Sequence, residues 1–388
     1  MLKEILFLTT GNLHGWATRL ISGLCADLEN VGLTVERVAL DQLAREDINL
    51  LLDKLATPSE DRLLITFNGR VEFPGQLPNG EPYKLGCRHL CWIVDNPGAH
   101  LQALRRLPPD TYIGVIDESH ISALRWLDLD LQGLFVPHKP DSLSIDFASQ
   151  SNRTNAVAVP GNIGPVLSCE AFKSQNPPQL HPYIEAACAA AETLSRKPGV
   201  VHDLFQDSCT SVGANMAELN ADLRSGLLSY IESTGQNLAR RRLIKALANH
   251  VEVDVFGDVA NPAEFDGKTI YFHGVSDYET VLSACGTRQA VANVTPKYAS
   301  GATERVWDAL TQGALVLSTQ TTQLSGASDI PGVRFIDLEL DDEDLSRSLA
   351  KWVQGDALSK ERARLADQTY TNDPTQSRAQ HIVNYFSD

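Results

Sequence analysis

Short hydrophobic segments alternate with helical patterns over the first 160 residues, and this alternation constrains the fold more than any other sequence feature. Each segment is apolar through its middle and ends in polar residues, glycine or proline, as in KEILFLTT (3–10), DRLLITFNG (61–69), RHLCWIVDNP (88–97) and TYIGVIDESH (111–120). A strand that is apolar along its whole length is buried on both faces, which is typical of a parallel sheet covered by helices. Ligands of such sheets bind at the carboxyl ends of the strands, so the polar residues there are candidate site residues.

The second half of the chain predicts another alternating unit after a helical interruption. Residues 168–250 contain no convincing strand, and strands return from VEVDVFGDV (251–259) to VRFIDL (333–338). We therefore predict an α/β protein with two Rossmann-like domains: an N-terminal domain over 1–154, a C-terminal domain over 155–375 that includes the helical segment 168–250, and a C-terminal helix over 376–388. Two such domains suggest a cleft between them, where pockets commonly form.

The net charge of −16 disfavours nucleic acid as a partner, because phosphate backbones select basic surfaces. No apolar run is long enough to span a bilayer, so we expect no integral membrane segment, while peripheral association stays open. The N-terminal apolar stretch is too short for a signal peptide and lacks a small-residue cleavage site, which predicts a cytoplasmic protein. The seven cysteines show no zinc-like pairing.

The stretch GATERVWDALTQGALVLS (301–318) carries most of the chemical information. Its apolar residues recur at helical spacing and predict a buried stripe, while Glu304 and Asp308, four residues apart, project together from the other side. Ser300 or Thr303 is a candidate N-cap. A helix N-terminus after a small-residue loop attracts anions, and Arg305 adds a donor for a phosphate. A carboxylate one turn further in suits the hydroxyls of a ribose.

A structural interpretation of the same residues is also open. Acidic residues in the first turn of a helix stabilise its dipole, and Arg305 then pairs with Asp308 on a solvated face. Spacing alone does not decide between a ligand site and an ordinary helix start.

Residues 271–318 resemble the C-terminal core of group 1-type glycosyltransferases, most closely the spore-maturation-protein-B-like branch. The resemblance rests on His273-Gly274, Tyr278-Glu279, Asn293 and the run from Gly301 to Val316. WIVDNP (92–97) resembles a phrase in the N-terminal domain of the same proteins. The resemblance implies a GT-B fold, with two Rossmann-like domains whose parallel sheets face a central cleft, the nucleotide sugar on the C-terminal domain and the acceptor on the N-terminal one.

Residue by residue, the resemblance implies a donor site on this stretch. Asp308 stands where the family usually has a glutamate that contacts the donor ribose. Glu304 and Arg305 match a Glu-Arg pair near the donor sugar and diphosphate, and the segment from Gly301 to Thr303 presents backbone N–H groups to phosphate. Asn293 belongs to the same donor side. GT-B enzymes usually need no bound metal, so we expect neither a metal nor a cofactor.

Three residues of the N-terminal half are catalytic candidates. Asp95 ends a predicted strand and is a candidate general base on an acceptor hydroxyl, although Asp-Asn-Pro-Gly is also strong turn chemistry. Asp117 is a similar strand-end acid, and helix capping is its alternative role. His14 follows the first strand, where a loop between donor and acceptor is expected in the family, although a lone histidine is more often a structural hydrogen-bonding residue.

Two further patterns favour structural roles. Asp128-Leu-Asp130 is a DxD string that holds a metal in another glycosyltransferase class, but here it reads as a solvated turn. Arg240, Arg241 and Arg242 have the charge to attract a diphosphate, yet such a run is more often a solvated helix face.

The sequence predicts a glycosyltransferase that moves a sugar from a nucleoside diphosphate sugar, such as a UDP-sugar, to a glycan, lipid-linked or protein acceptor. Two alternatives stay open. One is an epimerase or phosphorylase of the same fold, and the other is a non-catalytic binding protein, which the Asp at position 308 keeps under consideration.

Overall fold

The computed structural model describes residues 1–10, 15–73, 83–108, 110–139, 142–143, 153–326, 330, 332–353, 361, 370–371 and 377–387. The chain forms two compact units. Unit 1 contains Met1–Ser142 and Thr371–Asp388, and unit 2 contains Leu143–Tyr370. These limits differ from the expected domains, because unit 1 ends before residue 154 and includes the C-terminal helix.

Unit 1 is built on a six-stranded sheet in the order β2-β1-β3-β4-β5-β6. The strands pair in parallel throughout, as the alternation of hydrophobic segments predicts. Their bounds are β1 Glu4–Thr9, β2 Thr34–Ala39, β3 Arg62–Phe67, β4 Arg88–Ile93, β5 Thr111–Val115 and β6 Gln132–Phe135. The central strands β1, β3 and β4 are almost wholly buried, whereas the edge strand β2 is mostly exposed. The apolar runs of the sequence thus mark the central strands.

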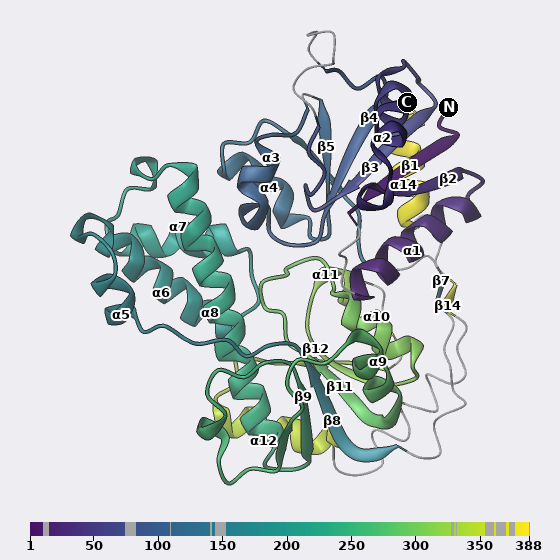
Figure 1. The fold of residues 1–388 in the computed structure, drawn as a ribbon. Helices are drawn as coiled ribbons and strands as arrows, with labels where there is room; N and C mark the ends of the chain where they lie inside the picture. Colours follow the sequence, from purple (N-terminus) through teal and green to yellow (C-terminus); the bar gives the residue numbers. More distant parts are fainter. Residues whose placement is uncertain are drawn as a thin grey trace. The chain divides into compact units, whose positions relative to one another are not determined.

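Helices cover both faces of this sheet (Figure 1). They are α1 Gly15–Asn30, α2 Arg45–Ala56, α3 Leu101–Leu104, α4 Ser119–Trp126 and α14 Arg378–Ser387, with 3-10 turns at Leu40–Gln42 and Pro97–His100. The last helix, α14, returns from the end of the chain to pack beside α1. There Arg378 donates to Asp27, with nitrogen–oxygen distances of 2.6 and 2.7 Å, and both side chains are buried. A buried ion pair therefore joins the two ends of the sequence within unit 1.

Unit 2 is built on a second six-stranded sheet in the order β10-β9-β8-β11-β12-β13. Its strands are β8 Thr154–Pro160, β9 Glu252–Phe256, β10 Ile270–Phe272, β11 Arg288–Asn293, β12 Leu315–Thr319 and β13 Val333–Ile336. All five neighbouring pairs are parallel. Counted along this unit the order is 3-2-1-4-5-6, which is that of a dinucleotide-binding sheet. Two short strands, β7 Ser142–Leu143 and β14 Tyr370–Thr371, form a separate two-stranded sheet.

The helices of unit 2 include a cluster that the sequence predicts between the first and second strands. This cluster contains α5 Cys169–Ser174, α6 His181–Arg196, α7 Val201–Ser211 and α8 Ala221–Leu247, with 3-10 turns at Pro178–Leu180 and Met216–Glu218. The others are α9 Tyr278–Thr287, α10 Glu304–Thr311, α11 Thr322–Gly326 and α12 Asp342–Val353, with a 3-10 turn at Pro262–Phe265. Helix α8 runs from the cluster to the sheet (Figure 1) and has buried residues along its whole length. The helical segment is therefore joined to the sheet by one continuous helix.

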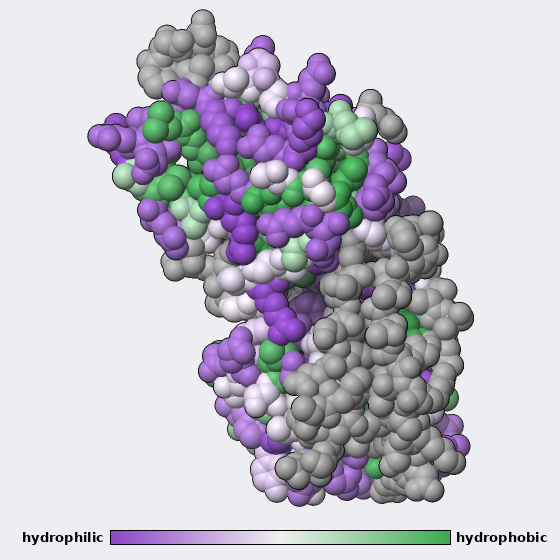
Figure 2. Space-filling view, turned by 90° about the vertical axis from the view of Figure 1, so that its right-hand side faces the viewer, coloured by the Kyte–Doolittle hydropathy of each residue, from purple (hydrophilic) through white to green (hydrophobic). Residues whose placement is uncertain are grey.

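None of the helices in the described ranges is long and apolar enough to cross a bilayer. Hydrophilic residues cover much of the described surface in Figure 2, with hydrophobic residues in smaller areas between them. Large exposed hydrophobic side chains, such as Leu50 in unit 1 and Val275 in unit 2, are normal when they are scattered singly.

A histidine is buried in the core of unit 1. His89 on β4 lies between two threonine hydroxyls, with its Nε2 2.9 Å from Thr66 and its Nδ1 2.9 Å from Thr111. The Thr111 hydroxyl also donates to the Pro108 carbonyl, so its oxygen accepts from Nδ1–H, and Nε2 accepts from Thr66. Burial lowers the pKa of His89 to about 3. The ring is thus held neutral.

This histidine is expected to make the stability of unit 1 depend on pH. An unfolded histidine binds a proton below pH 6.5, whereas folded His89 does so only near pH 3, so the unfolded state binds more protons between these values. The free energy of unfolding should fall by roughly 3 kcal/mol between pH 6.5 and pH 4 through this residue alone. Urea unfolding across that range measures it. In the His89→Gln variant this contribution should disappear, and an unchanged pH slope would contradict the assignment.

Candidate active site in unit 2

The candidate site of unit 2 lies at the carboxyl ends of two neighbouring strands, β8 and β11. The strand that follows β8 in the chain, β9, lies on one side of this pair, and the strand that follows β11, β12, lies on the other. The strand order therefore reverses between β8 and β11, and ligands of open α/β sheets bind at such a point. The loop after β8 contains residues 161–164, and the loop after β11 contains residues 294–303 and leads into α10. The side chains of these two loops and of α8 build the candidate site.

Gly161 opens the loop after β8 in a backbone conformation that suits glycine. Its φ is +118°, and a Cβ atom here would lie 3.0 Å from Nη2 of Arg240. A larger residue would therefore displace the Arg240 guanidinium. Because glycine has no Cβ, the loop can pass close to the Arg240 guanidinium at the end of β8.

Arg240 is the most deeply buried cation of the site, at 6% exposure. Its Nη1 donates to the carbonyl of Asn162 at 2.6 Å. With its amide oriented so that the oxygen faces the guanidinium, Gln236 accepts from the same Nη1 at 3.1 Å. Burial and, to a smaller extent, repulsion from Arg305 lower the pKa of Arg240 to about 9, while Glu304 acts in the opposite direction. The two guanidinium groups therefore repel each other, and an anion bound by both would relieve that repulsion.

The interpretation of the arginine run as a solvated helix face is wrong. The Arg241 and Arg242 side chains are 15% and 13% exposed. Arg241 donates to the carbonyl of Gly164 at 3.0 Å, and Arg242 donates to Asp342 at 2.7 Å. The sequence shows the run but not the burial, because α8 is buried on several faces by elements distant in the sequence.

Helix α10 begins where the sequence predicts, and its apolar stripe is buried. Thr303 occupies the N-cap position, but its hydroxyl makes no capping bond and donates instead to Oδ1 of Asn293 at 2.9 Å. Asn293 in turn donates to Ser318 on β12 at 3.1 Å. The N–H of Ala302, expected to face a phosphate, donates to the side chain of Gln323 at 2.8 Å. Gly301 and Thr303, both buried, thus lie in a hydrogen-bonded loop that fixes the helix start.

Glu304 and Arg305 lie together at this helix start. Nη2 of Arg305 is 3.7 Å from Oε1 of Glu304, and the two side chains are 30% and 18% exposed. The charges of both side chains act on the pKa of Arg240. The structure therefore has the predicted Glu-Arg pair at the start of α10, where the charges of both residues act on an arginine of α8.

The carboxylate of Asp308 is held by a hydrogen bond from a neighbouring helix. Its Oδ2 accepts from the hydroxyl of Tyr278 at 2.6 Å. Tyr278 is the first residue of α9, whose N-cap Asp277 accepts from the N–H of Thr280 at 2.8 Å. The sequence shows Tyr278 and Asp308 as separate motif positions, and only the packing of α9 against α10 joins them.

The catalytic candidates of the N-terminal half belong to unit 1. Asp95 follows β4, its side chain is 47% exposed, and its carboxylate lies 3.6 Å from Nε2 of His100. Asp117 follows β5, is fully buried, and accepts from the backbone N–H of Ser119 at 3.0 Å, which is a turn contact at the start of α4. His14 lies outside the described residues. The roles of all three remain predictions.

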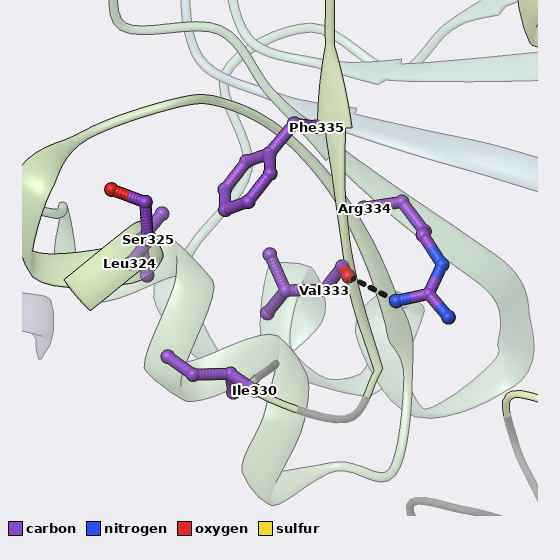
Figure 3. Close-up of a pocket in the computed structure, with 6 residues that line it drawn as sticks. All are labelled: Leu324, Ser325, Ile330, Val333, Arg334 and Phe335. Atoms are coloured by element: carbon purple, nitrogen blue, oxygen red, sulfur yellow. Dashed lines mark hydrogen bonds between the residues drawn. The ribbon is translucent and has the colours of Figure 1, made fainter. Parts of the chain in front are cut away.

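A small cavity of about 180 Å³ lies elsewhere in unit 2, beside the edge strand β13. In Figure 3, Val333 and Phe335 lie on one side of the strand and Arg334 on the other, where its guanidinium is 5.0 Å from the Trp352 ring. The remaining lining residues are Leu324, Ser325 and Ile330. The cavity contains none of the predicted donor residues and is smaller than typical ligand pockets of 300–1,000 Å³. It is therefore not the candidate active site.

Three solved structures that resemble this chain over nearly its whole length are glycosyltransferases. An α-glucosyltransferase in complex with UDP and a 13-mer DNA matches 100% of this chain and 99% of its own, at 9% identity and a TM-score of 0.52. AviGT4, a glycosyltransferase of avilamycin A biosynthesis, matches 99% of this chain and 97% of its own, at 12% identity and a TM-score of 0.47. HepE from Anabaena, in complex with UDP and glucose, matches 99% of both chains, at 9% identity and a TM-score of 0.49. No family model and no curated protein matches the chain.

The likeness to the α-glucosyltransferase confirms the predicted class of fold. The chain has a GT-B fold, with two six-stranded parallel sheets, each flanked by helices. At this identity the likeness bears on the fold alone. The spore-maturation-protein-B-like branch remains a prediction.

Proposed function

We propose that this protein is a glycosyltransferase that moves a sugar from a nucleoside diphosphate sugar to a glycan, lipid-linked or protein acceptor. One observation carries the proposal: buried Arg240 lies at the switch point of the unit 2 sheet, where its pKa is lowered by the charge of the partly exposed Arg305 at the start of α10. Two guanidinium groups at a helix N-terminus suit a diphosphate, which carries charge on several oxygens.

UDP is the first nucleotide to consider, because the similar α-glucosyltransferase and HepE were solved with it. In the proposed arrangement Arg240 and Arg305 bind the diphosphate, and Asp308, held by Tyr278, accepts from the ribose hydroxyls. Glu304 lies on the side of the donor sugar. The order of these groups along α10 matches the order of diphosphate and ribose along the donor.

In the proposed reaction the bond between the sugar C1 and the diphosphate oxygen breaks, and a bond between C1 and an acceptor oxygen forms. The diphosphate leaves with the electron pair, and the two arginines stabilise the charge that develops on it. The proton of the acceptor hydroxyl passes to a base, for which Asp95 is the proposed group if configuration inverts, with Asp117 and His14 as the other candidates. We propose that the reaction needs no bound metal, because the two cations supply the charge.

Thermal unfolding with UDP and with pyrophosphate, in the presence of EDTA, tests this function. Both ligands should raise the melting temperature, and UDP should raise it more, because only UDP carries a ribose. In the Asp308→Ala variant the response to pyrophosphate should persist, while the additional response to UDP should largely disappear.

The exposed acid Glu343 on α12, 86% exposed, offers a matched control. A Glu343→Ala variant should respond to both ligands as the wild type does. If neither ligand stabilises the wild-type protein at millimolar concentration, the proposed donor site is wrong. Hydrolysis of a UDP-sugar without acceptor would further exclude a non-catalytic binding protein.

A further inference from the structure

Helix α8 presents three polar side chains on one face, toward the loops of the candidate site. Glu232, Gln236 and Arg240 are four residues apart and therefore lie above one another. At the C-terminal end of this row, Arg240 donates a hydrogen bond to the loop after β8. At the N-terminal end of the row is Glu232, whose side chain is only 10% exposed. Helix α8 thus holds Glu232 and Arg240 at a fixed separation, and each contacts a different loop of the site.

Glu232, at the N-terminal end of the row, contacts the other loop of the site, which follows β11. Oε2 of Glu232 lies 3.5 Å from Nζ of Lys297, whose side chain is 17% exposed. Lys297 also lies 5.3 Å from the ring of the next residue, Tyr298. Tyr298 is itself buried and acts on the pKa of Arg240. Contacts therefore link Glu232 to Lys297 and Lys297 to Tyr298, and the charge of Tyr298 acts on Arg240, the arginine proposed to bind the diphosphate.

The same loop is fastened at its other end by backbone bonds. The N–H of Gln323 donates to the carbonyl of Ser300 at 2.8 Å, and the N–H of Thr322 donates to the carbonyl of Ala299 at 3.1 Å. The N–H of Gly199, which precedes α7, donates to the carbonyl of Pro296 at 3.2 Å. The loop that carries the start of α10 is thus held between α11 and the helical segment of unit 2.

A largely buried ion pair contributes little net stability, because removing both charges from water costs about as much as their attraction returns. Its effect is to fix one arrangement, since any shift of the loop would separate two largely buried opposite charges. We infer that Glu232 is a positioning residue of the donor site: through Lys297 it fixes the loop 294–303, so that Arg305 and the start of α10 face Arg240. This role rests on the proposed function and assigns part of the helical segment to donor binding.

UDP binding measured by calorimetry, with urea unfolding on the same samples, tests this inference. Glu232→Gln and Lys297→Gln should each weaken UDP binding by about tenfold, the size of coupling found between neighbouring residues of one network. The double variant with the charges exchanged, Glu232→Lys and Lys297→Glu, should recover affinity to within about threefold of wild type. If Lys297 instead bound the diphosphate directly, the exchange would place a carboxylate there and binding would stay weak.

Asp342→Asn is the matched control, since it removes another ion pair of α8, that with Arg242. It should leave UDP affinity unchanged. The inference is overturned if the single variants bind UDP as wild type does, if the exchanged pair binds no better than the weaker single variant, or if affinity losses only follow losses in unfolding free energy. If wild-type protein binds no UDP, the proposed function fails and the inference fails with it, whereas normal wild-type binding with unaffected variants refutes the inference alone.

Discussion

Replacing Arg240 by glutamine is expected to weaken UDP binding roughly ten- to hundredfold. A hydrogen bond to a charged group contributes about 1.5–3 kcal/mol, and Arg240 is a buried donor whose strength is not reduced by solvent. Glutamine keeps a donor amide beside the Asn162 carbonyl, so the loop after β8 retains a partner. Calorimetric titration with UDP and with pyrophosphate measures the effect. The loss of affinity should be of similar size for both ligands, because in the proposed site the arginine contacts the diphosphate.

Arg242→Gln provides a control on the same helix. The Arg242 side chain is 13% exposed, and it donates to Asp342 and to the carbonyls of Leu338 and Leu340 rather than to the loop after β8. This variant should lose stability while it binds UDP with unchanged affinity. Equal losses of affinity in the Arg240 and Arg242 variants would mean that both act through folding, and the phosphate role of Arg240 would then be wrong.

Arg378→Met is expected to lower the free energy of unfolding of unit 1 by roughly 3–5 kcal/mol, the cost of breaking a buried ion pair by removing one partner. Asp27 would remain buried without the guanidinium that lies 2.6 Å away. The carbonyl of His138 would also lose the donor that lies 3.2 Å from it. Urea unfolding followed by the fluorescence of unit 1 tryptophans measures the change.

The double variant Asp27→Leu with Arg378→Met should recover much of this loss, because no charge then stays buried. Arg347 on α12 supplies the exposed comparison, since its side chain is 60% exposed and lies 2.9 Å from Glu343. Arg347→Gln should lower the free energy of unfolding by less than about 1 kcal/mol. A loss of that small size in the Arg378 variant would show that α14 is not fastened by this pair.

The sequence by itself determined the regular elements of this protein. Buried strands such as β3 and β4 are apolar over their whole length, so their hydrophobic runs mark them without knowledge of their neighbours. The apolar stripe of α10 is equally local, because residues three and four apart on a helix share a face. The strand-end position of Asp95 and the place of Glu304, Arg305 and Asp308 at a helix start follow from the same local patterns.

Only the tertiary structure decided which of these residues meet. Arg240 reaches the end of β8 because the long helix α8 returns to the sheet, and the sequence of its arginine run is the same whether that face is solvated or buried. Tyr278 and Asp308 are 30 residues apart and come together through the packing of α9 against α10. Helix α14 joins unit 1 through a partner 351 residues away. Local patterns reflect the backbone period of a helix or strand, whereas contacts of this kind depend on how distant elements pack, which no short segment encodes.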